Sequence, residues 1–155
     1  MSEKVPYMPP PFRSVTPHIV VKDSAAAIDF YKKAFGAEER FRMPNPSGKG
    51  IMHAEIMIGD SVIMMAEEMA ERGCHSPISL KGTPVSLMIY VEDADSAYEQ
   101  AVAAGAEGRM PPQDMFWGDR FSQVSDPFGH LWSISTHLRD PSPEEITAGV
   151  AAFGQ

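Results

Sequence analysis

The chain has 155 residues, of which 43% are hydrophobic and 22% are charged. This length and composition are typical of one folded domain with a sizeable core, and they exclude a chain that is disordered throughout. The formal net charge of −8 at pH 7 argues against a nucleic-acid partner, because such proteins carry a basic patch.

Residues 1–14 carry the run Pro9-Pro10-Pro11, which disfavours both helix and sheet interior. We expect an extended N-terminal arm. This part of the chain has no apolar run of signal-peptide length, and no later run reaches the roughly twenty apolar residues of a membrane span, so no membrane partner is expected. Cys74 is the single cysteine, which excludes an internal disulfide framework and favours a cytoplasmic location.

The first half of the chain reads as a strand, a helix and three further strands. A strand is predicted over 16–21, and the helix that follows is capped by Asp23 or Ser24 and ends at Gly36. Alternation of polar and apolar residues predicts strands over 39–43, 51–58 and 61–66. In the middle strand of these three, His53 and Glu55 share one face, opposite an apolar face that suits a covering helix.

The second half repeats this order after a linker over 70–84. We predict a strand over 86–91, a helix over 94–104 that is capped by Asp93, and a hairpin of strands over 120–125 and 131–135. The pair Pro111-Pro112 is expected to interrupt the chain between helix and hairpin. One βαβββ unit cannot bury its own apolar face, so the repeat predicts two modules, 15–69 and 85–137, in a single domain over 15–137.

The C-terminal tail over 138–155 is an addition to the repeat. Ser142-Pro143-Glu144-Glu145 has the pattern of a capping box with proline at the first helical position. Ile146, Val150 and Phe153 follow at helical spacing. We therefore predict a short amphipathic helix that needs an apolar surface to pack on.

Three stretches now resemble the vicinal oxygen chelate superfamily, which includes glyoxalase I, extradiol dioxygenases and bleomycin-resistance proteins. The first stretch, 20–38, contains Val-Val-Lys-Asp, Ala-Ile-Asp-Phe-Tyr and Phe-Gly-Ala-Glu. The second is Ile-Gly-Asp-Ser-Val-Ile-Met at 58–64, and the third is Ser-Asp-Pro-Phe-Gly-His-Leu-Trp at 125–132. His-Ala-Glu at 53–55 and Met-Phe-Trp-Gly-Asp-Arg at 115–120 further resemble the PhnB-like subgroup. The resemblance implies an α+β fold in which two βαβββ modules pair into a cupped mixed sheet with helices outside, in a homodimer.

Metal-dependent members of that superfamily hold their ion with His or Glu on the first and last strand of each module. Carried over by motif spacing, those positions are Thr16, Met64, Ser86 and Ser133. Hydroxyl and thioether groups are poor ligands for a hard or borderline divalent cation. We therefore expect no metal cofactor, with a displaced site made of His18, His53 and Glu55 as the alternative.

The same mapping predicts a ligand pocket with apolar walls and a few hydroxyl groups. Trp117 and Arg120 are added because an aromatic face beside a guanidinium can clamp a flat ligand, although Asp119 and Arg120 equally fit a local ion pair. The predicted pocket residues are Thr16, His18, His53, Glu55, Met64, Ser86, Met88, Tyr90, Trp117, Arg120 and Ser133.

These residues favour a cytoplasmic, metal-free, dimeric protein that sequesters a small, partly apolar or aromatic compound. One alternative is a metal-dependent lyase, isomerase or dioxygenase that uses the displaced site. Another is a non-catalytic scaffold that uses its C-terminal helix for contacts. The sequence does not choose a reaction, because a general acid or base is identified by geometry first.

Overall fold

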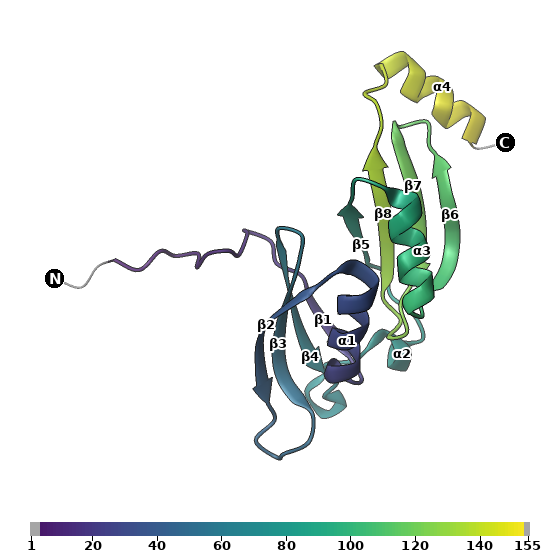
Figure 1. Ribbon diagram of the computed structural model, residues 1–155. Coiled ribbons are helices and arrows are strands. Elements are labelled where there is room, and N and C mark those ends of the chain that lie inside the picture. The colour runs from purple at the N-terminus through teal and green to yellow at the C-terminus, as the bar shows by residue number, and fades with distance from the viewer. Residues whose placement is uncertain (1–3, 154–155) are drawn as a thin grey trace. The chain divides into compact units, whose positions relative to one another are not determined.

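The computed structural model describes residues 4–153, and the chain divides into two compact units between Lys81 and Gly82. The first three residues of the predicted arm and the last two of the predicted tail lie outside the described residues. Each unit contains one four-stranded mixed sheet with a helix packed on it (Figure 1). No helix within 4–153 is long and apolar enough to cross a membrane.

The first unit has the predicted βαβββ order. Its elements are β1 (His18–Val21), α1 (Ser24–Phe35), β2 (Glu38–Pro44), β3 (Ile51–Ile58) and β4 (Ser61–Glu67), followed by the 3₁₀ turn η1 (Ala70–Arg72) and the short α2 (Pro77–Leu80). The sheet order is β1-β4-β3-β2, with β1 parallel to β4 and the other pairs antiparallel. The predicted linker thus contains two short helical turns.

The second unit repeats this topology. Its elements are β5 (Ser86–Tyr90), α3 (Ala94–Ala104), β6 (Glu107–Asp114), β7 (Asp119–Ser125), β8 (Leu131–His137) and α4 (Pro143–Phe153). The sheet order is β5-β8-β7-β6, and β5 again runs parallel to the last strand of its sheet. The α+β class and the duplicated βαβββ order are therefore confirmed.

Local signals explain why the two long helices begin and end where they do. The Asp23 carboxylate accepts a hydrogen bond from the Ala26 N–H, and the Asp93 carboxylate accepts one from Ser96 in the same way. Each bond satisfies one of the N–H groups that a helix leaves unpaired at its start. Gly36 ends α1 in the left-handed conformation, at φ 64°, which a side chain would disfavour.

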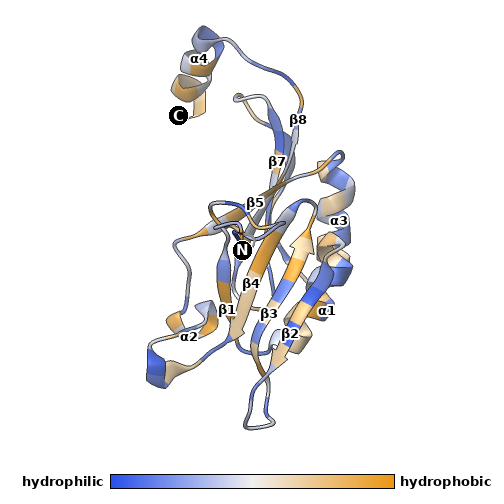
Figure 2. Ribbon diagram, turned by 90° about the vertical axis from the view of Figure 1, so that its left-hand side faces the viewer, coloured by the Kyte–Doolittle hydropathy of each residue, from blue (hydrophilic) through white to orange (hydrophobic). Residues whose placement is uncertain are grey.

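The core of the first unit lies between α1 and the sheet. Ala27, Ile28 and Tyr31 of α1 are fully buried, and they face Ile56 of β3 and Met65 of β4, which are also fully buried. Apolar residues continue along β4, which is mostly orange in Figure 2. Among the described residues, α1 is the one helix in extensive contact with this sheet, and the face away from α1 carries more polar side chains, such as His53 and Glu55.

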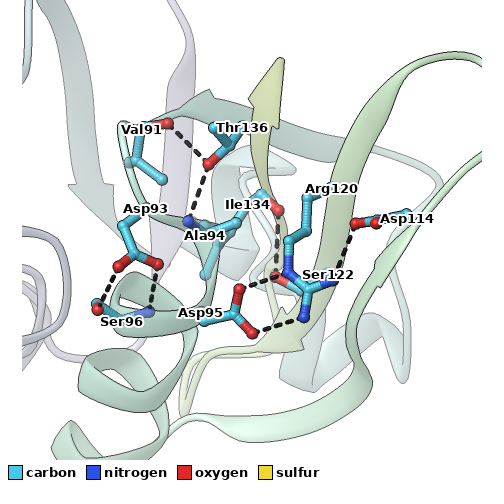
Figure 3. A network of polar contacts seen from close by, with 10 residues as sticks. All are labelled: Val91, Asp93, Ala94, Asp95, Ser96, Asp114, Arg120, Ser122, Ile134 and Thr136. Carbon is cyan, nitrogen blue, oxygen red and sulfur yellow. Dashed lines mark hydrogen bonds and ion pairs between the residues drawn. The ribbon is translucent and has the colours of Figure 1, made fainter. Parts of the chain in front are cut away.

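In the second unit, the corresponding core side chains are Trp132, Ile134 and Val124, which face α3. The Thr136 hydroxyl joins strand to helix, since it donates to the Val91 carbonyl and accepts from the Ala94 N–H, each at 2.9 Å (Figure 3). The same position in the first unit is served by Glu67, whose carboxylate accepts from the Ser24 N–H at 3.1 Å.

Two predictions about strands are wrong. Pro111 and Pro112 lie inside β6, because β6 is the edge strand of its sheet and the pairing with β7 is irregular between Met110 and Gln113. A proline is tolerated there since its missing N–H is not required by a neighbour. Thr16 lies outside β1, which begins at His18, although the Pro17 carbonyl still accepts from the Met64 N–H.

The predicted C-terminal helix is present as α4. Its capping box forms as the sequence indicates: the Ser142 hydroxyl accepts from the Glu145 N–H, and the Glu145 carboxylate accepts from the Ser142 N–H. The ring of Phe153 lies 5.8 Å from that of Phe116, in the loop between β6 and β7. Val150 and Phe153 remain exposed, so α4 buries little of its apolar side.

Candidate functional site

The uncovered face of the first sheet gathers most of the first unit's predicted pocket residues. Strand register places Phe41 opposite Glu55, Glu55 opposite Met64, and Met64 opposite His18. These four side chains form one row across β2, β3, β4 and β1, on the face away from α1. His53 lies in the adjacent row, opposite Met43. We call the set Phe41, His53, Glu55, Met64 and His18 the ring row.

The His53 ring lies within contact distance of two other aromatic rings of the ring row, those of His18 and Phe41. The His18 and His53 imidazoles are stacked, with centroids 5.8 Å apart and planes inclined by 24°. The Phe41 ring lies 6.3 Å from that of His53. The Phe41 ring is inclined by 49° to that of His53 and is 45% exposed, so it offers an aromatic face that is open to a ligand.

Glu55 gives the ring row its one carboxylate. Its side chain is 16% exposed, and its Oε2 accepts from Nη1 of Arg40 at 3.1 Å. Its Oε1 lies 3.6 Å from Nε2 of His53, which is longer than a hydrogen bond. One oxygen of Glu55 is thus fixed by an ion pair while the other is available to a hydrogen-bond donor.

The N-terminal arm reaches this region through Phe12. The guanidinium carbon of Arg40 lies 5.6 Å from the centre of the Phe12 ring, which is a cation–π distance. Arg40 is therefore held between the Glu55 carboxylate and an aromatic ring of the arm. Sequence reasoning missed both residues, since no local pattern relates Phe12 to Arg40.

The electrostatics of the ring row favour a neutral His18. Burial, and then the neighbouring His53, lower the pKa of the His18 imidazole below its usual value of 6.5. The pKa falls because burial and a neighbouring imidazole both disfavour the charged form of the ring. At neutral pH the stacked imidazole of His18 is uncharged and offers an aromatic surface with one N–H donor and one acceptor nitrogen.

The donor set does not fit the divalent metal that the superfamily implies. His18, His53 and Glu55 gather on one face as the displaced-site alternative expects, but Arg40 already pairs with the Glu55 carboxylate. Within 4–153, no three His, Cys, Asp or Glu side chains have a spacing that holds a metal ion. Thr16, one of the positions carried over from the superfamily, donates its hydroxyl hydrogen bond to the Arg13 carbonyl.

The second unit presents its predicted pocket residues on its own uncovered sheet face. Met88 lies opposite Ser133, and Ser133 lies opposite Gln123, whose amide nitrogen is 3.5 Å from the Ser133 hydroxyl. Met88 is 47% exposed, whereas Ser133 is buried. Ser86, which lies opposite Leu131 at the start of β5, is exposed on the same face.

Tyr90 ends this face with a contact that the sequence did not reveal. Its hydroxyl donates to Oδ2 of Asp119 at 3.0 Å, and Asp119 is only 4% exposed. Since β8 lies between β5 and β7, the Tyr90 side chain passes over β8, where it lies opposite Ser135. The Ser135 hydroxyl is buried and has no hydrogen-bond partner among the described residues.

Asp119 also contacts His137, its register partner across β7 and β8. Its Oδ1 lies 2.8 Å from Nδ1 of His137. Ser125 pairs with Leu131 at the turn, and six residues further from the turn along each strand Asp119 pairs with His137. The hairpin prediction therefore contained the signal for this pair.

The proposed clamp of Trp117 and Arg120 is wrong. Arg120 points to the helix-covered face, where its guanidinium pairs with Asp95 of α3 and, at 2.9 Å, with Asp114 of β6 (Figure 3). Asp95 and then Asp114 raise the pKa of Arg120. Trp117 packs instead edge-on against Phe121, at 5.7 Å. Alternation along β7 explains this, since Arg120 and Phe121 must point to opposite faces.

One further hollow lies in the first unit, between the β2–β3 loop and the end of β4. Its volume is about 500 Å³, and Lys49, Met52, Glu67, Glu71 and Arg72 are among its lining residues. None of the predicted pocket residues lines it. Because both cationic and anionic side chains line this hollow, its lining indicates no single class of ligand.

Comparison with known proteins agrees with this architecture. The model of the Glyoxalase/Bleomycin resistance protein/Dioxygenase superfamily matches residues 13–134. Uncharacterized protein Rv0887c from Mycobacterium tuberculosis (strain ATCC 25618 / H37Rv) is 40% identical over 144 residues, which are 91% of this chain and 84% of that protein.

Two solved structures have a similar fold. TioX from Micromonospora sp. ML1 is 28% identical, with a TM-score of 0.62 over 79% of this chain and 97% of TioX. A glyoxalase/bleomycin resistance protein/dioxygenase family enzyme from Burkholderia phytofirmans PsJN is 21% identical, also with a TM-score of 0.62, over 79% of this chain and 97% of that one; it supports the fold alone. The chain belongs to the glyoxalase/bleomycin resistance protein/dioxygenase superfamily.

Proposed function

We propose that this protein binds and sequesters a small, planar, partly apolar or aromatic compound on the uncovered face of its first sheet. The observation that carries the proposal is the ring row, in which stacked rings adjoin Met64 and a mostly buried carboxylate. Small-molecule sites combine apolar and aromatic walls with a few placed polar groups, and this surface has that composition. In this proposal the protein binds its ligand and does not transform it.

The polar groups of the ring row define which planar compounds are favoured. The free Oε1 of Glu55 accepts a hydrogen bond from an N–H or O–H at the edge of the ligand, while the rings of His53 and Phe41 contact its face. Arg40 keeps the carboxylate in place from the other side.

Calorimetry with planar aromatic and bleomycin-like compounds tests this function. We expect measurable heat with at least one planar compound, and about tenfold weaker binding in His53→Ala and in Phe41→Ala, the equivalent of about 1.4 kcal/mol for each lost ring contact. His75→Ala, which removes an exposed imidazole in the connecting segment, is the matched control and should bind normally. Absence of heat from every compound, or equal weakening in His75→Ala, would contradict the proposal.

The second candidate is a metal-dependent lyase, isomerase or dioxygenase with the displaced site. The stacked contact of His18 with His53 beside Glu55 favours it, and the ion pair of Glu55 with Arg40 opposes it. Metal analysis after dialysis separates the two readings. Stoichiometric nickel, zinc, manganese or iron that disappears in His53→Ala would overturn the metal-free proposal.

We further propose a cytoplasmic homodimer of the PhnB-like subgroup. The single cysteine supports the reducing compartment, and the exposed Val150 and Phe153 of α4 supply apolar surface for a second copy. Light scattering gives the oligomeric state directly. A mass near the 17.0 kDa of one chain would refute the dimer, and a dimer that binds no small molecule would favour the non-catalytic scaffold.

A further inference from the structure

His137, at the end of β8, lies between two carboxylates. Its Nδ1 is 2.8 Å from Oδ1 of Asp119, and its Nε2 is 2.9 Å from Oδ1 of Asp140. Asp119 is buried in the sheet, whereas the Asp140 side chain is 96% exposed and belongs to the segment that leads to α4. One imidazole therefore connects the second sheet to the start of the C-terminal segment.

Both contacts exist together only when the ring is an imidazolium. An ionised carboxylate accepts hydrogen bonds and donates none, and a neutral imidazole has a single N–H. Two carboxylates facing the two ring nitrogens therefore require a proton on each nitrogen. We propose that His137 is a pH-dependent clasp that ties Asp140, at the start of the C-terminal segment, to the second unit when protonated and releases it when neutral.

Burial decides which contact is lost on deprotonation. An ionised carboxylate left without partners in a buried position costs much more free energy than one that water can solvate. The neutral ring therefore keeps its proton on Nδ1, toward Asp119, and the exposed Asp140 is released. Asp119 also keeps the hydrogen bond from the Tyr90 hydroxyl.

The other groups around His137 do not replace the clasp. Tyr90 of β5 donates to Asp119 and stays protonated, since that carboxylate raises the pKa of its phenol. Arg139 pairs with Glu145 of α4 at 3.1 Å, with both side chains about half exposed. The N–H groups of Leu138 and Arg139 donate to the Gly118 carbonyl at any pH. The Arg139–Glu145 pair and the contact of Phe116 with Phe153 still hold α4 when the clasp opens, so we expect a partial loosening that begins at Asp140.

The direction of the pH dependence follows from the two carboxylates. Asp119 and then Asp140 raise the pKa of His137 above its usual value of 6.5. A raised pKa in the folded state means that the contact is fully present below pH 6.5 and is lost as the pH rises through the raised value. The clasp is closed below pH 6.5 and opens as the pH rises through the raised pKa of His137.

The test combines a histidine titration with hydrogen exchange of α4. By NMR, we expect His137 to titrate above 6.5 with both ring nitrogens protonated at low pH, and Asp140→Asn to lower that pKa. After correction for the intrinsic exchange rate, the amides of α4 should exchange about two- to fivefold faster above the pKa than below it, as suits the loss of one exposed ion pair. Asp140→Asn should show the faster rate at both values of pH.

An exposed carboxylate far from His137 in the sequence provides the control for this test. Asp60→Asn, which alters another exposed loop carboxylate, should leave both the titration and the exchange unchanged. His137→Gln should exchange at one rate across the range. If the His137→Gln variant does not fold, the Asp140→Asn variant alone tests the clasp, because the Asp140 side chain is exposed and its replacement does not disturb the core. A His137 pKa at or below 6.5, or α4 exchange that is equal on both sides of it, overturns the clasp.

Discussion

The carboxylate of Asp126 organises the turn between β7 and β8. It accepts hydrogen bonds from the N–H groups of Phe128 and His130 and from Nε1 of Trp132, each at 2.9 Å, and Asp126 is 5% exposed. Trp132 is the largest fully buried side chain of the described residues. The residue that closes the turn therefore also satisfies the one polar atom of a core tryptophan.

At this scale, we expect Asp126→Asn to destabilise the protein by about 3 kcal/mol, since hydrogen bonds to a charged group are strong and an amide N–H₂ would face a donor. Urea unfolding measures the difference. Asp29→Asn, on the exposed side of α1, is the matched control and should change stability by less than about 0.5 kcal/mol. Equal effects of the two substitutions would show that the turn does not depend on the charge.

Residue-level prediction from sequence succeeded where the signal was local. The caps at Asp23, Asp93 and Ser142 and the shared face of His53 and Glu55 follow from neighbours a few positions away. The pairing of Asp119 with His137 also follows from the register of the hairpin. Arg40 with Phe12 was not readable, because a contact between an arm and an edge strand leaves no periodic pattern.

At the scale of elements, the attachment of α4 depends on a close approach that only glycine permits. A Cβ added at Gly149 would lie 2.4 Å from Cγ of Phe116, well inside van der Waals contact. The amphipathic pattern of Ile146, Val150 and Phe153 predicted the helix but not its partner. The partner could not be predicted because Phe116 lies in a loop whose conformation depends on the β6–β7 pairing.

We therefore expect Gly149→Ala to loosen α4, since overpacking costs about 1–3 kcal/mol while alanine gains about 1 kcal/mol in helix propensity. In a Phe116→Ala background the clash is absent, so the same substitution should stabilise α4 by about 1 kcal/mol. Hydrogen exchange of the α4 amides in the four proteins of this cycle measures both signs. A stabilising effect of Gly149→Ala in the native background would exclude the close contact.

At the scale of the whole molecule, several carboxylates are held ionised by hydrogen bonds. The Ser76 backbone N–H, and then the Ser79 hydroxyl, lower the pKa of Glu68 to about 2. The Ser96 N–H lowers the pKa of Asp93, and Arg120 lowers that of Asp95. These groups lie in both units, so the effect of acid is distributed along the chain.

A depressed folded-state pKa contributes stability above the unfolded pKa and loses it as the pH falls through the folded value. Stability should therefore decline from about pH 4.5 downward, over a window that extends to about 2 for Glu68. Urea midpoints followed by circular dichroism between pH 7 and pH 2 test this. Glu68→Gln should flatten the low end of the profile, while Asp60→Asn should leave it unchanged.

The duplicated order and the fold class were predictable from sequence because both halves repeat the same capped helix and alternating strands. Pro111 and Pro112 misled the prediction, since proline excludes a central strand and the position of β6 at the sheet edge is a property of the whole topology. Arg120 was misassigned for a related reason. The face to which the Arg120 side chain points is set by the alternation of side chains along β7, which begins at Asp119.

Two prolines distinguish β6 from β2, the corresponding edge strand of the first sheet. An edge strand offers unpaired N–H and C=O groups on which a foreign strand can assemble, and proline withholds the donor. β6 carries two prolines in its interior, whereas β2 has only Pro44, at its last position. Proline thus protects the β6 edge against strand-by-strand aggregation, whereas the β2 edge depends on its charged side chains, Glu39, Arg40 and Arg42, for the same purpose.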